Sequence, residues 1–372
     1  MKAINYKILL SPFIDHRTRA VVQQYNPTKL ENRIDSEQVS IFVFDYNATS
    51  IVQKKLDKVE SCYVYSDSPH ITWINVDGIN KKEVEKLSTH YKIHPLIQED
   101  ILSVGQRPKM DDIDGLVYCL LNMLYFNSVT GGVEQEQISI VLGKNFVISF
   151  QEDAQRDVFN PLREKLQIAS SKLRQTGADY LFYNMIDLIV DNYFVVMEKL
   201  GENIELVEEE IIRKANRQTM GKVNQLRKEM IVLKRNLNPV RDMVNGILRS
   251  DNELLDEKIY KYFKDIYDHI VQATDLVENY RDMVMSLQDL YLNNVNLKMN
   301  EIMKFLAIVT TLMAPATVIG GIFGMNFEVI PYSHHKLGFY GAVAIMLLFP
   351  LLMLFLFYKR GWFQKDNPQE EG

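Results

Sequence analysis

Two stretches near the C-terminus are apolar over their whole length and carry no charge. Neither Phe305–Phe327 nor Leu337–Tyr358 contains an Asp, Glu, Lys or Arg. An α-helix needs about 20 mostly apolar residues to cross the hydrocarbon part of a bilayer. The pattern therefore predicts two transmembrane helices, at 305–327 and 337–358, joined by a short extracytoplasmic loop at 328–336.

The chain that leads into the first apolar stretch has the pattern of one long helix. Neither Gly nor Pro occurs between Gly246 and Pro315. These two residues are the usual helix stops, so their absence favours an unbroken helix over 247–326. We expect its first part, 247–304, to be a charged stalk that continues into the membrane.

Residues 1–175 have the pattern of an α/β domain. Segments rich in β-branched and aromatic residues alternate with turn residues, which is typical of strands. The expected strands are 39–45, 71–76, 116–126, 137–142 and 145–150, and the expected helices are 81–91 and 95–102. Gly143-Lys144-Asn145 predicts a hairpin between the last two strands. We expect a mixed sheet with helices packed on it.

From residue 176 the spacing of apolar residues becomes helical. We expect an antiparallel helical pair over 176–246, whose second helix ends near Asn238-Pro239 because proline interrupts helices. The last segment, 359–372, is expected to be a basic tail on the cytoplasmic side.

Flanking charges predict the orientation of the two spans. Lys298 and Lys304 precede the first span, and Lys359, Arg360 and Lys365 follow the second. Basic residues concentrate on the cytoplasmic side of a membrane. Both termini are therefore expected in the cytoplasm of a multi-pass protein. The first residues lack the apolar run of a signal peptide, and two cysteines are too few for a disulfide framework.

The sequence gives little sign of an enzyme. Gly143-Lys144 and Gly221-Lys222 lack the upstream Gly and the following Ser or Thr of a phosphate-binding loop. No nucleophile–base pair stands out, and no nucleic acid is expected as a partner.

Small and polar residues recur along the first span at alternating steps of three and four. They are Asn300, Met303, Ala307, Thr310, Ala314, Thr317, Gly321 and Gly324. Such a seam suits close packing of two membrane helices. It equally suits a pore, in which Thr hydroxyls and the Asn326 amide form oxygen rings around an axis. Neither span holds a carboxylate, and a neutral ring suits Mg2+, which keeps several of its waters.

Acidic residues outnumber basic ones between Asp251 and Asp282. A charge run of this kind is usually a solvated helix face. Carboxylate oxygens are also the ligands that hard divalent cations take, so a cation site is the second interpretation.

The segment Glu301–Pro331 resembles the first membrane helix of the CorA magnesium transporters, whose signature tripeptide is here Gly324-Met325-Asn326. Its position before a short loop and a second terminal span strengthens the resemblance. The stretches 93–109, 178–199 and 262–269 also resemble this family.

The resemblance implies a homopentameric, CorA-like funnel. Its fold class is an α/β N-terminal cytosolic domain plus an all-α stalk with two C-terminal transmembrane helices. The implied selectivity filter is Gly324, Met325 and Asn326, and the implied pore-lining or gate residues are Asn300, Met303, Leu306, Thr310, Ala314 and Thr317, with Met303 and Leu306 at the gate. The implied regulatory cation ligands, shared between neighbouring subunits, are Asp100 and Asp265 with Glu99 and Asp187.

The predicted function is therefore a passive Mg2+ channel in the cell inner membrane, driven by the membrane potential and closed by cytosolic Mg2+. Its partners are the lipid bilayer and divalent cations, with Mg2+ both transported and regulatory. One alternative is a Co2+, Ni2+ or Zn2+ transporter of the same architecture. The other is a membrane-anchored cation sensor that does not conduct.

Overall fold

The computed structural model of the protein describes residues 35–36, 39–153, 156, 158–326, 328, 330 and 335–362. The chain divides into two compact units, Met1–Asp289 and Leu290–Gly372. The expected cytoplasmic tail beyond residue 362, most of the expected loop 328–336, and the N-terminal residues tested for a signal peptide lie outside the described residues.

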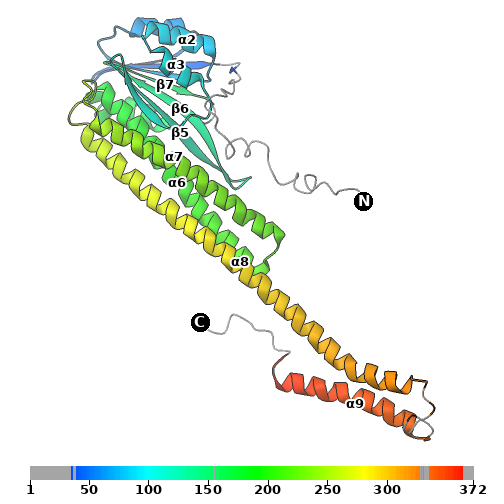
Figure 1. The fold of residues 1–372 in the computed structure, drawn as a ribbon. Coiled ribbons are helices and arrows are strands. Elements are labelled where there is room, and N and C mark those ends of the chain that lie inside the picture. The colour runs from blue at the N-terminus through cyan, green and yellow to red at the C-terminus, as the bar shows by residue number, and fades with distance from the viewer. Residues whose placement is uncertain are drawn as a thin grey trace. The chain divides into compact units, whose positions relative to one another are not determined.

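A seven-stranded mixed sheet forms the core of the α/β part of the first unit (Figure 1). In chain order its strands are β1 (Ser40–Tyr46), β2 (Ile51–Leu56), β3 (Ile71–Asp77), β4 (Lys109–Ile113), β5 (Leu116–Asn127), β6 (Gly132–Leu142) and β7 (Phe146–Gln151). Their spatial order is β2-β1-β3-β7-β6-β5-β4, and only the β3–β7 pair is parallel. The expected mixed sheet is confirmed, and β2 and β4 are strands that the sequence pattern did not predict.

The expected hairpin after β6 is also confirmed. Leu142 pairs with Val147, and Gly143 donates its N–H to the Phe146 carbonyl over 2.9 Å. A Cβ on Gly143 would lie 2.3 Å from the Phe146 ring, so a larger residue here would require that ring to move.

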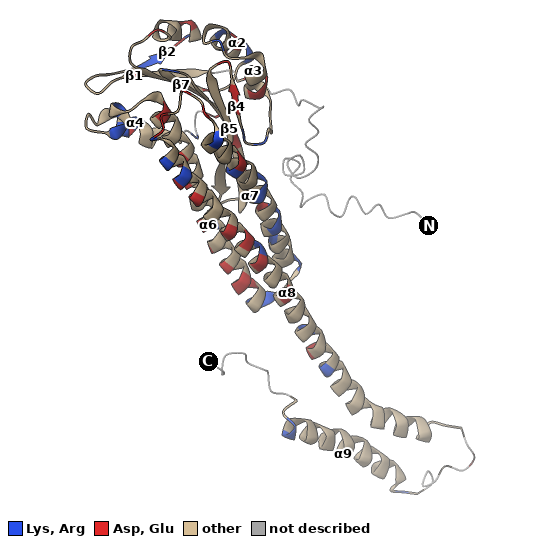
Figure 2. Ribbon diagram, turned by 60° about the vertical axis from the view of Figure 1, so that its left-hand side comes forward, with Lys and Arg blue, Asp and Glu red and all other residues tan. Residues whose placement is uncertain are grey.

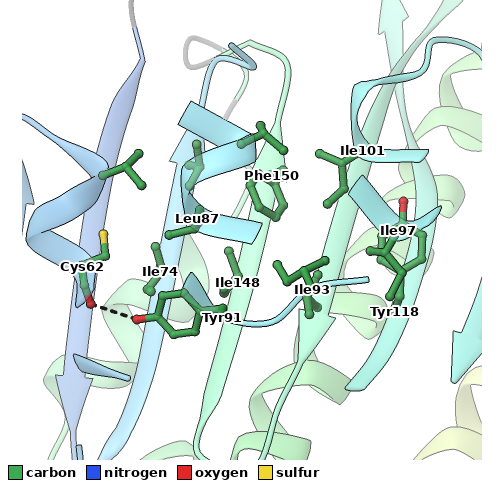
Figure 3. Close-up of a cluster of buried hydrophobic side chains, with 14 of the residues drawn as sticks. Cys62, Ile74, Leu87, Tyr91, Ile93, Ile97, Ile101, Tyr118, Ile148 and Phe150 are labelled. Atoms are coloured by element: carbon green, nitrogen blue, oxygen red, sulfur yellow. Dashed lines mark hydrogen bonds between the residues drawn. The ribbon is translucent and has the colours of Figure 1, made fainter. Parts of the chain in front are cut away.

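Helices cover both faces of the sheet. The helices α2 (Lys81–His90) and α3 (Pro95–Leu102), with the 3-10 helix η2 (Val59–Tyr65), lie on one face. Figure 3 shows Ile97 and Ile101 of α3 close to Tyr118 of β5, and Tyr91 donating its hydroxyl to the Cys62 carbonyl. Both expected helices of this layer are confirmed, and α3 is fixed by two fully buried isoleucines.

The opposite face carries the short helices α4 (Asn160–Gln167) and α5 (Lys172–Gln175) and the long pair α6 (Ala178–Lys214) and α7 (Arg217–Arg249). Trp73 of β3 stacks on Phe44 and meets the edge of Phe159 on this side. The expected antiparallel pair is present, joined by two residues.

Helix α7 does not stop at Pro239, where the sequence pattern placed its end. Pro239 lies inside the helix, which continues to Arg249. Proline removes one hydrogen bond and costs about 3 kcal/mol in a helix interior. Val240, Val244 and Ile247 follow it at helical spacing and are completely buried, so their burial offsets this cost.

The expected unbroken helix over 247–326 is wrong at its start, because α8 spans Tyr260–Phe323. The side chain of Asn252 accepts the N–H of Leu254 over 2.8 Å, and that of Asp256 accepts the N–H of Lys258 over 2.8 Å. Short polar side chains that bond nearby N–H groups compete with a helix. The stalk is therefore separated from α7 by a turn segment that contains no Gly or Pro.

The second unit contains the end of α8 and the helix α9 (Gly338–Lys359). Both helices are long and apolar enough to cross a membrane. Figure 2 shows no charged residue on the last part of α8 and charge on α9 only at its C-terminal end. This agrees with the two expected spans.

Candidate pore and cation-binding sites

The seam residues of α8 are exposed in the single chain. Met303 of the seam is 57% exposed, and Leu306, the other residue expected at the gate, is 62% exposed. Every other residue expected at the pore, at the gate or in the filter is exposed too. These are Asn300, Thr310, Ala314, Thr317, Gly324, Met325 and Asn326. A large apolar surface of this kind indicates contact with lipid or with another chain.

The opposite face of α8 packs within the unit. Its less exposed positions recur every three to four residues and include Lys304, Ile308, Leu312, Pro315 and Ile319. Helix α9 has a matching row, in which Met346 lies within 3.7 Å of a Cβ placed at Gly320. At about 100° per residue, the seam lies roughly on the far side of α8 from Ile308. The seam therefore does not take part in the contact between α8 and α9.

The two seam threonines bond to their own helix. Thr310 donates its hydroxyl to the Leu306 carbonyl over 2.8 Å, and Thr317 donates to the Met313 carbonyl over 3.0 Å. A hydroxyl has one hydrogen and two lone pairs. With the hydrogen used inside the helix, each oxygen presents only acceptor capacity away from it, which is the polarity that a cation requires.

The signature tripeptide ends the helix. Gly324 donates its N–H to the Gly320 carbonyl over 2.9 Å, and Met325 donates to the Ile322 carbonyl over 3.3 Å. A Cβ on Gly324 would lie 3.1 Å from the Gly320 carbonyl oxygen, a tight contact. Asn326 follows outside the helix, with its amide exposed at the helix end.

Asp100 is paired inside the chain. Its Oδ2 lies 2.5 Å from Lys109 Nζ, and the same ammonium lies 3.1 Å from Asp111 Oδ2. Burial raises the pKa of Asp100, against the opposing effect of Lys109. Burial would lower the pKa of Lys109, but the two carboxylates outweigh it and raise that pKa, so the ammonium stays charged at neutral pH. Glu99, the other expected ligand on α3, is exposed.

A second cluster joins α6 to α8. Ligand atoms of Asp187, Asp191 and His269 all lie within 4.8 Å of one another. Tyr183 donates its hydroxyl to Asp187 Oδ2 over 3.2 Å. Burial, followed by the Asp191 carboxylate, raises the pKa of Asp187. Oxygen and imidazole ligands of this kind suit a divalent cation.

The structure brings some of the expected cation ligands near one another and leaves others apart. Asp265 interacts electrostatically with Asp187, so these two share one region between α6 and α8. Asp100 has Lys109 as its partner. His269 was not expected from the sequence, although it lies one helical turn from Asp265 on α8 and stacks edge-on against Phe194.

Figure 2 shows acidic residues along α6 and basic residues along α7.

Residues 68–360 match the family described as CorA-like Mg2+ transporter protein. The chain belongs to this family. It is 37% identical over 327 residues to the cobalt/magnesium transport protein CorA of Thermotoga maritima, covering 88% of this chain and 93% of that protein. Membership in the CorA-like family confirms the resemblance read from the tripeptide.

Solved structures agree with this family assignment. The complete structure of the CorA magnesium transporter from Methanocaldococcus jannaschii matches with a TM-score of 0.71 and 25% identity, covering 88% of this chain and 100% of that one. The cytoplasmic domain of ZntB from Vibrio parahaemolyticus matches with a TM-score of 0.52 at 13% identity, covering 69% of this chain and 98% of that one. The second match shows a shared fold alone. The CorA-like fold class is confirmed, with a sheet domain, long helices and two C-terminal membrane-type helices.

Proposed function

We propose that the protein is a passive Mg2+ channel of the cell inner membrane, built from several copies of the chain around the α8 seam, in the number of five that its family resemblance implies. The observation that carries the proposal is the seam itself. Its residues face away from α9 and are exposed, and they end at Gly324-Met325-Asn326. Copies packed through this face would enclose an axis lined by Thr oxygens, with the Asn326 amides at its mouth.

The lack of charged residues along the lining favours a hydrated divalent cation. Neither span contains a carboxylate that would hold the ion tightly. Mg2+ gives up its waters reluctantly, and a ring of amide oxygens binds it through its water shell. Met303 and Leu306 form the narrow apolar part of the path, which closes by excluding water.

Cytosolic Mg2+ closes the channel in this proposal. Asp100 of one subunit and Asp265 of the next bind the ion, with Glu99 and Asp187 close by. Facing carboxylates repel each other when no ion is present, which loosens the contact between subunits. An ion that binds the closed state better shifts the population toward it, and only by the difference in affinity.

The test is ion uptake into liposomes that hold the purified protein, with Mg2+, Co2+, Ni2+ and Zn2+ compared. We expect Mg2+ uptake by the wild type. We expect the Asn326→Ala variant, which lacks the amide oxygen that binds the ion's water shell, to fall to the level of protein-free liposomes.

The mass of the detergent-solubilised oligomer is the control, since Asn326→Ala must assemble like the wild type for the comparison to hold. Normal uptake by an assembled Asn326→Ala variant removes the filter from this proposal. Uptake of Co2+, Ni2+ or Zn2+ without Mg2+ supports the alternative transporter, and the absence of any uptake supports the non-conducting sensor.

A further inference from the structure

The ion pair between α3 and β4 occupies one of the carboxylates that the proposed sensor needs. Lys109 Nζ lies between Asp100 Oδ2 at 2.5 Å and Asp111 Oδ2 at 3.1 Å. The Asp100 side chain is only 13% exposed, whereas the Lys109 side chain is 37% exposed. Lys109 is therefore the more solvent-accessible partner of the pair, and Asp100 is the more buried one.

Rigid elements hold both partners in place. Asp100 lies on α3, whose backbone is tied to β6 by a hydrogen bond from Gln137 Nε2 to the Asp100 carbonyl, 3.0 Å long. Lys109 and Asp111 lie two residues apart on β4, on the same face of the strand. In the sheet they pair with Leu120 and Tyr118 of β5. The backbones of both partners thus lie on regular elements and not on loops.

An ammonium and a divalent cation compete for the same carboxylate oxygen. A charge-assisted hydrogen bond of this length is among the strong ones, and partial burial protects it from screening by salt. A cation that binds Asp100 must displace Lys109 or share the carboxylate with a positive charge nearby. Both routes lower the affinity of the site.

We propose that Lys109 is a built-in competitor of the regulatory cation, and that it sets the Mg2+ concentration at which the sensor fills. This inference rests on the proposed function, in which Asp100 is a ligand of that cation. Lys109 binds no cation itself; it positions and neutralises Asp100 until the ion arrives. Its presence keeps the sensor empty until Mg2+ is abundant, so that the channel does not close too early.

The experiment measures protection of the full-length protein from protease over a Mg2+ titration. The Lys109→Met variant keeps most of the length of the side chain and loses its charge. We expect its midpoint of protection to fall about 5- to 20-fold in Mg2+ concentration, a coupling of the usual size between two sites. The Lys109→Arg variant keeps the charge and should stay close to the wild type.

Lys82→Met is the matched control, because it removes one exposed lysine from α2 on the same side of the sheet. Its midpoint should equal that of the wild type. An unchanged or higher midpoint for Lys109→Met overturns the inference and makes Lys109 a structural support. The midpoint of the Mg2+-dependent rise in melting temperature gives the same comparison if Lys109→Met is cleaved too fast to follow.

Asp100→Ala separates this inference from the proposed sensor. If Asp100→Ala loses Mg2+-dependent protection and Lys109→Met keeps the wild-type midpoint, only the competitor role is refuted. A wild-type midpoint in Asp100→Ala shows that Asp100 is not a ligand, which refutes the sensor and with it the competitor role.

Discussion

Glu136 on β6 is a buried carboxyl group with three hydrogen-bond partners. It is 4% exposed, and its Oε1 accepts the N–H groups of Glu152 and Asp153, each over 2.9 Å. Its Oε2 lies 2.9 Å from the Tyr125 hydroxyl, which also lies 2.7 Å from the Arg156 carbonyl. Tyr125 has one hydroxyl hydrogen to donate. A proton on Glu136 satisfies both contacts, with Glu136 donating to Tyr125 and Tyr125 donating to Arg156.

Burial raises the pKa of Glu136 from 4.5 to about 7, with the nearby Glu152 carboxylate adding to the effect. A carboxyl group whose pKa rises on folding stabilises the fold at low pH. That stabilisation is complete below the unfolded pKa and is lost as the pH rises from there through the folded pKa. We therefore expect the first unit to lose about 3 kcal/mol of stability between pH 4.5 and pH 8 through this residue.

The Glu136→Gln variant mimics the protonated form and should abolish this dependence. We expect it to melt like the wild type at about pH 5 and several degrees higher at about pH 8. The measurement is the melting temperature of the full-length protein in detergent. Glu164→Gln, at an exposed position on α4, is the control and should keep the wild-type slope. An equal fall in melting temperature for Glu136→Gln and the wild type contradicts the assignment.

At the scale of the element, two neighbouring threonines on α8 can test whether the seam lines a pore. Thr310 lies on the seam, and Thr311 lies about 100° further around the helix. Replacing either by Val keeps the shape and removes the hydroxyl. Thr310→Val should lower Mg2+ uptake at least about fivefold, since even one lost hydrogen bond to the hydrated ion is worth about 1 kcal/mol. Thr311→Val should leave uptake within about twofold of the wild type.

This pair distinguishes a pore from simple helix packing. If the seam only packs helices together, both variants should transport like the wild type, because Val fits the space of Thr. The measurement is initial uptake into liposomes at equal amounts of assembled protein.

Elements that depend on local pattern were predictable. The buried strands β3, β5 and β7 are rich in β-branched and aromatic residues, and the two spans are marked by the absence of charge. Strand β2 was not predictable, because it is an edge strand with mostly exposed residues, and its sequence IVQKKL carries little apolar pattern.

The predicted helix ends that were wrong have physical causes that the positions of Gly, Pro and apolar residues do not reveal. The turn before α8 is formed by the side chains of Asn252 and Asp256, which break a helix without Gly or Pro. Pro239 stays inside α7 because tertiary burial outweighs the local preference. The Asp100–Lys109 pair needs the register of β4 against the sheet, which no local pattern contains. The approach of Asp187 and Asp191 of α6 to His269 of α8 depends on how two helices pack, which the pattern along one helix does not contain.

At the scale of the whole molecule, the proposed channel needs no chemical energy source. A divalent ion gains about 4.6 kcal/mol on crossing a potential of 100 mV, twice the value for a single charge. We expect Mg2+ uptake into liposomes to rise when a K+ gradient with valinomycin makes the interior negative, and to fall when the gradient is reversed. Protein-free liposomes are the control. Uptake that ignores the potential and requires a proton or Na+ gradient would contradict a passive channel.

The threonine hydrogen bonds within α8 also bear on how the protein is made. Each copy of the chain must enter the bilayer before it meets the others, and an unsatisfied polar group in hydrocarbon costs several kcal/mol. Thr310 and Thr317 already donate to the carbonyls of Leu306 and Met313 in the single chain. A lone, newly inserted copy therefore exposes no unsatisfied hydroxyl hydrogen on its seam. Synthesis and insertion can proceed one chain at a time, with assembly as a later and separate event.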